Sequence, residues 1–69
     1  MESAVQNRLR EMRLHRNWTQ EHLAAAAAVS RQSINSIERG RYVPSLPLAL
    51  ELARLFECPL EHLFFLEKP

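Results

Sequence analysis

The stretch that decides the fold covers residues 18–50 and reads WTQEHLAAAAAVSRQSINSIERGRYVPSLPLAL. Thr19 and Ser30 each stand before a helical segment, and such side chains accept a hydrogen bond from a free amide in the first helical turn. Gly40 lies where the second segment needs a left-handed residue to end it. The stretch therefore predicts two short capped helices joined by a tight turn.

The second of these helices has one apolar and one polar side. Val29 and Ile34 have the spacing of a hydrophobic staple, and Ile37 continues the inward face one turn later. The other faces carry Arg31, Gln32, Asn35, Ser36 and Arg39. A short helix with an anchored inner face and a polar outer face is how a small protein presents side chains to the major groove of DNA.

Three further helices complete the predicted bundle. The helix after Pro44 is polar only on one narrow stripe, so we expect it to be the central buried helix. Pro59 suits the first position of the last helix. The predicted helices span about 3–16, 19–27, 30–39, 45–57 and 59–65. We expect one all-α domain over residues 1–69, a compact five-helix orthogonal bundle, with a short C-terminal tail that can be extended.

Size and composition restrict the function. A chain of 69 residues, 46% hydrophobic and 25% charged, fits one soluble globular domain with little room for a substrate pocket. The single cysteine, Cys58, cannot form an internal disulfide, which favours the reducing cytoplasm. No apolar stretch approaches the roughly 20 residues of a membrane span, and the N-terminus lacks the apolar segment of a signal peptide. We expect no membrane association.

Charge is distributed unevenly along the chain. Residues 1–43 carry seven arginines and four glutamates, whereas residues 44–69 carry one arginine, one lysine and four glutamates. The basic part contains the helix with the polar outer face, as a nucleic-acid-binding surface requires. A solvated basic surface would explain the same asymmetry.

These residues resemble the phage repressor and Cro type of helix-turn-helix domain, the Xre family. The resemblance extends from about Arg8 to Phe64. It is carried by T-Q-x-x-L-A at 19–24, V-S-R-Q-S-I at 29–34 and I-E-R-G-R-Y-x-P-S at 37–45. It implies a lambda repressor-like fold and sequence-specific binding to double-stranded DNA.

Two positions depart from the family pattern. Ala27 replaces a larger apolar residue, which leaves less side-chain volume in the core. Ala28 stands in the turn where glycine or asparagine is usual, and a left-handed alanine costs roughly 1–2 kcal/mol. Either the chain tolerates this strain or its turn differs.

The resemblance and the side-chain chemistry together suggest individual roles. Arginine can donate two hydrogen bonds to guanine, and glutamine can pair in the same way with adenine. The residues expected to read bases are Ser30, Arg31, Gln32, Asn35 and Ser36. The residues expected to contact phosphates are Thr19, Gln20, Arg39, Arg41 and Tyr42. The resemblance further implies a structural ion pair between Arg13 and Glu38. Capping, helix-end electrostatics or packing are the competing explanations for several of these positions.

The C-terminal segment has more apolar residues than so small a core needs. We expect Leu63, Phe65 and Leu66 to form a homodimer interface with the last helix, the tail pairing as a short strand. The alternative is that the tail folds back on the first helix. Two-fold pairing would place the DNA-reading helices about 34 Å apart, facing a palindromic operator.

The sequence therefore predicts a dimeric transcriptional regulator, most simply a repressor. An antitoxin or a restriction-modification controller with the same module remains an alternative, as does a protein-interaction adaptor that does not bind DNA. We expect no metal, because the three histidines and Cys58 lack the spacing of a zinc site. We also expect no catalysis, cofactor or small-molecule ligand, because Gly40 is the only glycine, so there is no Gly-rich phosphate loop, and no nucleophile–base pair is suggested.

Overall fold

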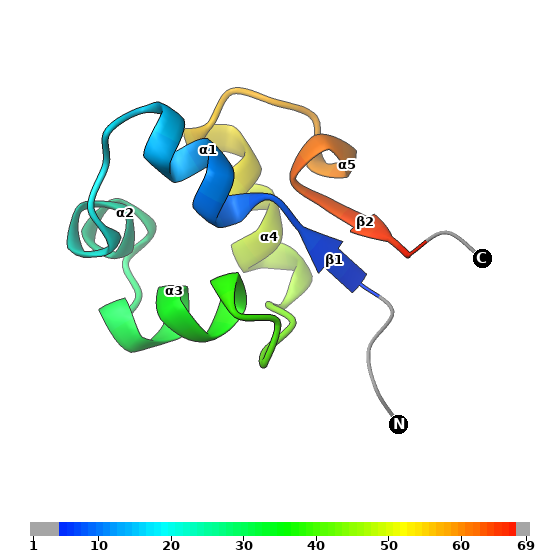
Figure 1. The fold of residues 1–69 in the computed structure, drawn as a ribbon, viewed down its shortest axis with the longest axis horizontal. Coiled ribbons are helices and arrows are strands. Elements are labelled where there is room, and N and C mark those ends of the chain that lie inside the picture. The colour runs from blue at the N-terminus through cyan, green and yellow to red at the C-terminus, as the bar shows by residue number, and fades with distance from the viewer. Residues whose placement is uncertain (1–4, 68–69) are drawn as a thin grey trace.

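The computed structural model describes residues 5–67, which form five helices and one two-stranded sheet. In chain order the elements are β1 (Val5–Asn7), α1 (Leu9–His15), α2 (Gln20–Ala27), α3 (Arg31–Glu38), α4 (Leu46–Leu55), α5 (Leu60–Leu63) and β2 (Phe64–Leu66). Figure 1 shows α2 at one end of the molecule and the strand pair at the other. The prediction of a five-helix bundle with a helix-turn-helix is confirmed.

All five helices contribute to one core. Its largest fully buried side chains are Leu9, Leu23, Ile34, Ile37, Leu52, Phe56 and Leu63. Burying an aliphatic side chain of this size contributes about 1.5–3 kcal/mol relative to leaving it exposed. Ile34 and Ile37 fix the inner side of α3, so the outer side of this helix stays in solvent. In Figure 1, α3 lies along one edge of the molecule with no other element beyond it.

The predicted caps of α2 and α3 are both formed. Thr19 Oγ1 accepts a hydrogen bond of 2.9 Å from the amide of His22, and Ser30 Oγ accepts one of 3.0 Å from the amide of Ser33. Gly40 follows α3 with φ +74°, the left-handed conformation expected there. The capping residues and the glycine were therefore enough to predict where α2 and α3 begin and where α3 ends.

The turn between α2 and α3 is left-handed at Ala28, with φ 59° and ψ 40°. The amide of Val29 donates to the carbonyl oxygen of Ala24 at 3.0 Å, and the amide of Ala28 donates to Ala25 at 3.2 Å. These are the two bonds of a Schellman motif, whose left-handed residue is usually glycine. The chain thus keeps the usual turn and tolerates the strain of an alanine in it.

The predicted first helix is wrong at its start. Residues 5–7 form β1, which pairs antiparallel with β2, and α1 begins only at Leu9; residues 3 and 4 of the predicted helix lie outside the described part. The side chain of Asn7 holds the junction between β1 and α1. Its Oδ1 accepts from the amide of Leu9 at 3.0 Å, and its Nδ2 donates to the carbonyl oxygen of Ile37 at 2.9 Å.

The last helix is shorter than predicted. It ends at Leu63, and Phe64–Leu66 continue as β2. The tail is extended as anticipated, but it pairs with β1 of its own chain, in the register Val5↔Leu66.

The central helix α4 is less buried than predicted. Its residues Ala49, Leu52 and Ala53 face the core, but Leu46 is 63% exposed and Leu50 is 50% exposed. In so small a bundle only one face of α4 can pack against the core, although the sequence of this helix is apolar on nearly all faces. An unpartnered apolar face therefore remains on α4.

Candidate nucleic-acid interface

The first turn of α3 projects into solvent. Ser30, Arg31 and Gln32 are exposed, and Asn35 and Ser36 are half-buried further along the helix. None of these five predicted base-reading residues belongs to the core. The side of α3 that would have to enter a groove is therefore free in this chain.

A shallow polar hollow lies on this side of α3. It has a volume of about 330 Å³ and is lined by Ser30, Gln32, Ser33, Ser36 and Tyr42. Tyr42 is 44% exposed, so it lies at the border of the hollow and not in the core. Arg31 and Asn35 lie outside the hollow's lining.

Ser33 is a lining residue that sequence reasoning missed. Its hydroxyl lies 3.0 Å from that of Ser30, and it is half-buried beside the exposed first turn. The spacing of three residues from the N-cap would have placed it on the same side of the helix.

Arg13 and Glu38 join α1 to the end of α3. The Nε of Arg13 donates to Glu38 Oε2 at 2.7 Å, and its Nη2 donates to Glu38 Oε1 at 3.2 Å. The Nη1 of Arg13 donates to the carbonyl oxygen of Trp18 at 2.8 Å. The hydrogen bonds to Glu38 raise the pKa of Arg13 above its ordinary value, although burial opposes them. The pair is bidentate and buried, which holds α3 at a fixed angle to the rest of the domain.

Gln20, the first residue of α2, has contacts on both ends of its amide. Its Nε2 donates to Glu38 Oε1 at 3.1 Å, and its Oε1 accepts from Nη1 of Arg31 at 3.4 Å. A residue predicted to contact phosphate thus lies between the buried ion pair and a residue predicted to read a base.

The other predicted phosphate-binding residues lie at the surface. Thr19 is exposed while its hydroxyl caps α2. Arg39, Arg41 and Tyr42 are exposed at the C-terminal end of α3. Cationic side chains at this end and free amides at the start of α2 are both suited to phosphate oxygens.

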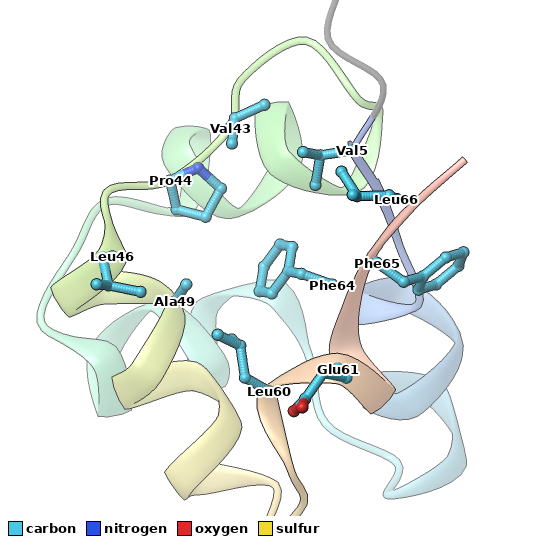
Figure 2. Close-up of a pocket in the computed structure, with 10 residues that line it drawn as sticks. All are labelled: Val5, Val43, Pro44, Leu46, Ala49, Leu60, Glu61, Phe64, Phe65 and Leu66. Atoms are coloured by element: carbon cyan, nitrogen blue, oxygen red, sulfur yellow. The ribbon is translucent and has the colours of Figure 1, made fainter. Parts of the chain in front are cut away.

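A second surface is an apolar groove of about 290 Å³ between α4, α5 and β2. Figure 2 shows the ring of Phe64 in the middle of this groove, whereas the ring of Phe65 points away from it. The groove is lined mainly by Val5, Val43, Pro44, Leu46, Ala49, Leu60, Phe64 and Leu66. Polar groups contribute little to it, so water in the groove gains few hydrogen bonds.

The three residues predicted to form a dimer interface have different environments. Leu63 has no exposed surface, and its assignment to an interface is therefore wrong: it belongs to the core. Leu66 is 72% exposed at the edge of the groove. Phe65 is half-buried, with the guanidinium of Arg8 at 4.3 Å from its ring centroid.

Within residues 5–67, no three or more histidine, cysteine, aspartate or glutamate side chains are grouped so that they could hold a metal ion. The helices of this part of the chain are too short or too polar to cross a bilayer.

Comparison with known proteins shows that this chain is similar to helix-turn-helix proteins. The family profile described as Helix-turn-helix matches residues 9–63. An uncharacterized HTH-type transcriptional regulator of Bacillus subtilis, YgzD, is 39% identical over 64 residues, which cover 93% of this chain and 97% of that protein. A second such regulator, MJ0272 of Methanocaldococcus jannaschii, is 44% identical over 63 residues, covering 91% of this chain and 96% of that protein.

A solved structure is similar as well. The restriction-modification controller protein C.AhdI from Aeromonas hydrophila aligns with a TM-score of 0.74 and 33% identity, over 80% of this chain and 83% of that one. The family match extends over all five helices from the start of α1 to the end of α5. The chain therefore belongs to the helix-turn-helix family of transcriptional regulators, in its phage repressor and Cro (Xre) type.

Proposed function

We propose that this protein regulates transcription by binding a specific sequence of double-stranded DNA, with the outer side of α3 in the major groove. The observation that carries the proposal is the first turn of α3. Arg31 and Gln32 project from it into solvent, while Ile34 and Ile37 anchor the same helix in the core. Rigid support beneath free polar side chains is what direct reading of base edges requires.

The base-reading roles follow from donor and acceptor patterns. Arg31 can donate two hydrogen bonds to O6 and N7 of a guanine, and Gln32 can pair with N6 and N7 of an adenine. Each such pair contributes about 1–3 kcal/mol of discrimination against a wrong base. We assign further contacts with base edges, next to those of Arg31 and Gln32, to Ser30, Asn35 and Ser36.

The phosphate-binding roles fall to residues at both ends of the helix-turn-helix. Thr19 and Gln20 lie at the start of α2, and Arg39, Arg41 and Tyr42 lie after α3. Such contacts fix the position of the protein on the duplex without reading its sequence. They also release counterions, so affinity is expected to fall steeply with salt.

We further infer that the protein acts as a homodimer. Leu46 and Leu66 both line the apolar groove, and Leu50 is exposed one helical turn after Leu46 on α4. A two-fold axis brings the same patch of both copies together, so the projecting leucines of one copy can enter the groove of the other. Phe65 and Leu66 remain in the proposed interface, and Leu46 and Leu50 join them.

A dimer of this kind suits a palindromic operator whose half-sites are one helical turn apart, with the two α3 helices about 34 Å from each other. Repression would follow from occupying DNA that RNA polymerase needs. Such a protein would act in the cytoplasm, where the bacterial or archaeal chromosome is accessible.

The experiment that tests the proposal is selection of bound duplexes from a random pool. We expect a palindromic consensus, and we expect its affinity to fall by orders of magnitude between about 50 and 200 mM salt. Failure to enrich any duplex would contradict the proposed function and would favour a protein-interaction adaptor.

One narrower role has a specific observation in its favour. The similarity to the controller C.AhdI raises the hypothesis that this chain controls a restriction-modification system. The selected consensus decides this question when it is located in the source genome: a site upstream of methyltransferase and endonuclease genes supports it, and a site elsewhere contradicts it.

A further inference from the structure

The chain leaves α3 through a short turn, residues 39–41, which we call the exit turn. The amide of Arg41 donates to the carbonyl oxygen of Ser36 at 3.0 Å, and the amide of Gly40 donates to that of Ile37 at 3.0 Å. These two bonds form a Schellman motif around the left-handed Gly40. Arg39 and Arg41, both assigned to phosphate contact, lie on either side of this glycine, so the exit turn decides where their side chains start.

A side chain from a distant strand holds the end of α3. Asn7 of β1 lies 30 positions before Ile37, and its Nδ2 donates to the carbonyl oxygen of Ile37 at 2.9 Å. Figure 1 shows that α3 ends on the side of the molecule where β1 lies. The carbonyl oxygen of Ile37 has two lone pairs, and Asn7 and Gly40 together use both of them.

Asn7 is itself fixed at its other atoms. Its Oδ1 accepts from the amide of Leu9 at 3.0 Å, and its residue in β1 lies opposite Phe64 of β2. Because the amide oxygen is bound at the start of α1, the amide nitrogen is directed toward α3. Asn7 therefore links the exit turn to the strand pair and to the start of α1.

The exit turn has little else to hold it. Arg39, Gly40 and Arg41 are all exposed, and a Cβ placed on Gly40 would meet no heavy atom of residues 5–67 within 4 Å. Exposed backbone hydrogen bonds at a helix end open readily. A turn that opens spreads the two arginines over many positions, and restricting them before binding reduces the entropy that binding costs.

The bond from Asn7 also changes the charge that a phosphate would meet. The last carbonyl groups of a helix carry a partial negative charge, which repels an anion. A second donor on the carbonyl oxygen of Ile37 offsets part of that charge, directly beside the arginines that would contact the phosphate.

We propose that Asn7 is a positioning residue for phosphate binding, which holds the exit turn so that Arg39 and Arg41 reach the DNA backbone together. The inference rests on the proposed function, because it concerns how assigned phosphate-contacting residues are held. It gives a residue of the strand pair, outside the helix-turn-helix itself, control over affinity for DNA of any sequence.

The test begins with Asn7→Ser. Serine can still accept from the amide of Leu9, as an N-cap residue does, but it is too short to reach Ile37. We expect Asn7→Ser to weaken binding to the selected operator and to unrelated duplexes alike, by about three- to tenfold. The slope of affinity against salt should fall by about one, while preference among operator variants stays unaltered.

A double-mutant cycle separates positioning from a general loss of folded protein. In a background that carries both Arg39→Ala and Arg41→Ala, Asn7→Ser should cause no further loss of affinity. In an Arg31→Ala background, the loss should persist in full. An equal loss in both backgrounds, or no loss in Asn7→Ser alone, would overturn the proposal and leave the proposed function intact. Absence of any selected operator would overturn the proposed function instead.

Gln6→Ser is the matched control. Gln6 is the neighbouring residue of β1, and its side chain donates to Glu67 at 3.0 Å, away from α3. Its replacement should leave DNA affinity unchanged, and a loss equal to that of Asn7→Ser would overturn the role of the bond to Ile37.

Amide hydrogen exchange tests the exit turn without DNA. In Asn7→Ser, the amides of Gly40 and Arg41 should exchange faster than in the parent protein, relative to the amide of Ile37 inside α3. Uniformly faster exchange at all three would show only a less stable domain and would overturn the proposal.

If Asn7→Ser does not fold, Asn7→Asp takes its place. Aspartate keeps the size of the side chain and the acceptor for Leu9, and lacks the donor for Ile37. Gln6→Glu then becomes the control, because it adds the same charge to the same strand. We expect Asn7→Asp to lose more affinity than Gln6→Glu, and equal losses would overturn the proposal.

Discussion

Arg13 and Glu38 form a bidentate ion pair between α1 and α3, with side chains that retain 9% and 2% of their surface. The nearest oxygen and nitrogen are 2.7 Å apart. The pair lies directly behind the helix assigned to DNA reading. Its integrity therefore controls both the stability of the domain and the angle at which α3 is presented.

Removing one partner of this pair should unfold much of the protein. Arg13→Met leaves the Glu38 carboxylate buried without its cation, and breaking a buried pair in this way costs about 3–5 kcal/mol. Urea unfolding followed by circular dichroism measures the loss. The exposed Arg54–Glu51 pair of α4 supplies a comparison: Glu51→Ala should change stability little, because solvent already screens that pair. Similar losses in the two variants would contradict the structural role of Arg13.

Ala28→Gly should stabilise the protein. Ala28 has φ 59°, which costs an alanine roughly 1–2 kcal/mol, and glycine adopts this conformation without that cost. Since glycine also increases the entropy of the unfolded chain, we expect a net gain of about 1 kcal/mol. Thermal unfolding should show a higher midpoint. Ala26→Gly, at an exposed position inside α2, is expected to lower the midpoint instead. A lower midpoint of thermal unfolding for Ala28→Gly would contradict the interpretation that Ala28 is strained.

Arg31→Ala and Arg41→Ala should have different kinds of effect on DNA binding. Loss of Arg31 is expected to cost about 1–3 kcal/mol on the selected operator and to relax preference at one base pair. Loss of Arg41 should weaken binding to all duplexes by a similar factor and reduce the slope of affinity against salt by about one. Anisotropy titrations at several salt concentrations separate these effects. The division between base reading and phosphate contact fails if both variants behave alike.

Leu50→Arg should dissociate the proposed dimer. Leu50 is 50% exposed on α4, so the change is tolerated by the monomer, whereas a charge placed in an apolar interface weakens association by about tenfold or more. Sedimentation equilibrium measures the dimer dissociation constant. Leu14→Arg is a matched control, because Leu14 is also 50% exposed but lies on α1, which contributes no residue to the proposed interface. Equal dissociation constants for the two variants would exclude this face as the interface.

The elements that sequence reasoning located correctly are those with short-range signals. Thr19, Ser30 and Gly40 each act on atoms within three residues of themselves, so their meaning does not depend on the rest of the fold. The register of Ile34 and Ile37 likewise follows from helix geometry once α3 begins at Arg31. The exposed outer side of α3, and with it the set of candidate base-reading residues, followed from these signals.

The errors all involve contacts between distant parts of the chain. Val5–Asn7 reads as the start of a helix, and becomes a strand because Phe64–Leu66 lies beside it. Leu63 is buried and Leu46 is exposed although both are leucines at the ends of helices, because the packing of the bundle decides which side each helix turns inward.

The sequence by itself determined the helix-turn-helix and its polar outer side, since caps, turns and helical periodicity act over a few residues. Only the tertiary structure decided the strand pair, the apolar face left on α4 and the contact of Gln20 with Glu38. These depend on segments up to 61 positions apart being brought together, as in the Val5↔Leu66 pair. Local preferences carry no information about such pairings, because their free energy arises only when the whole bundle has closed.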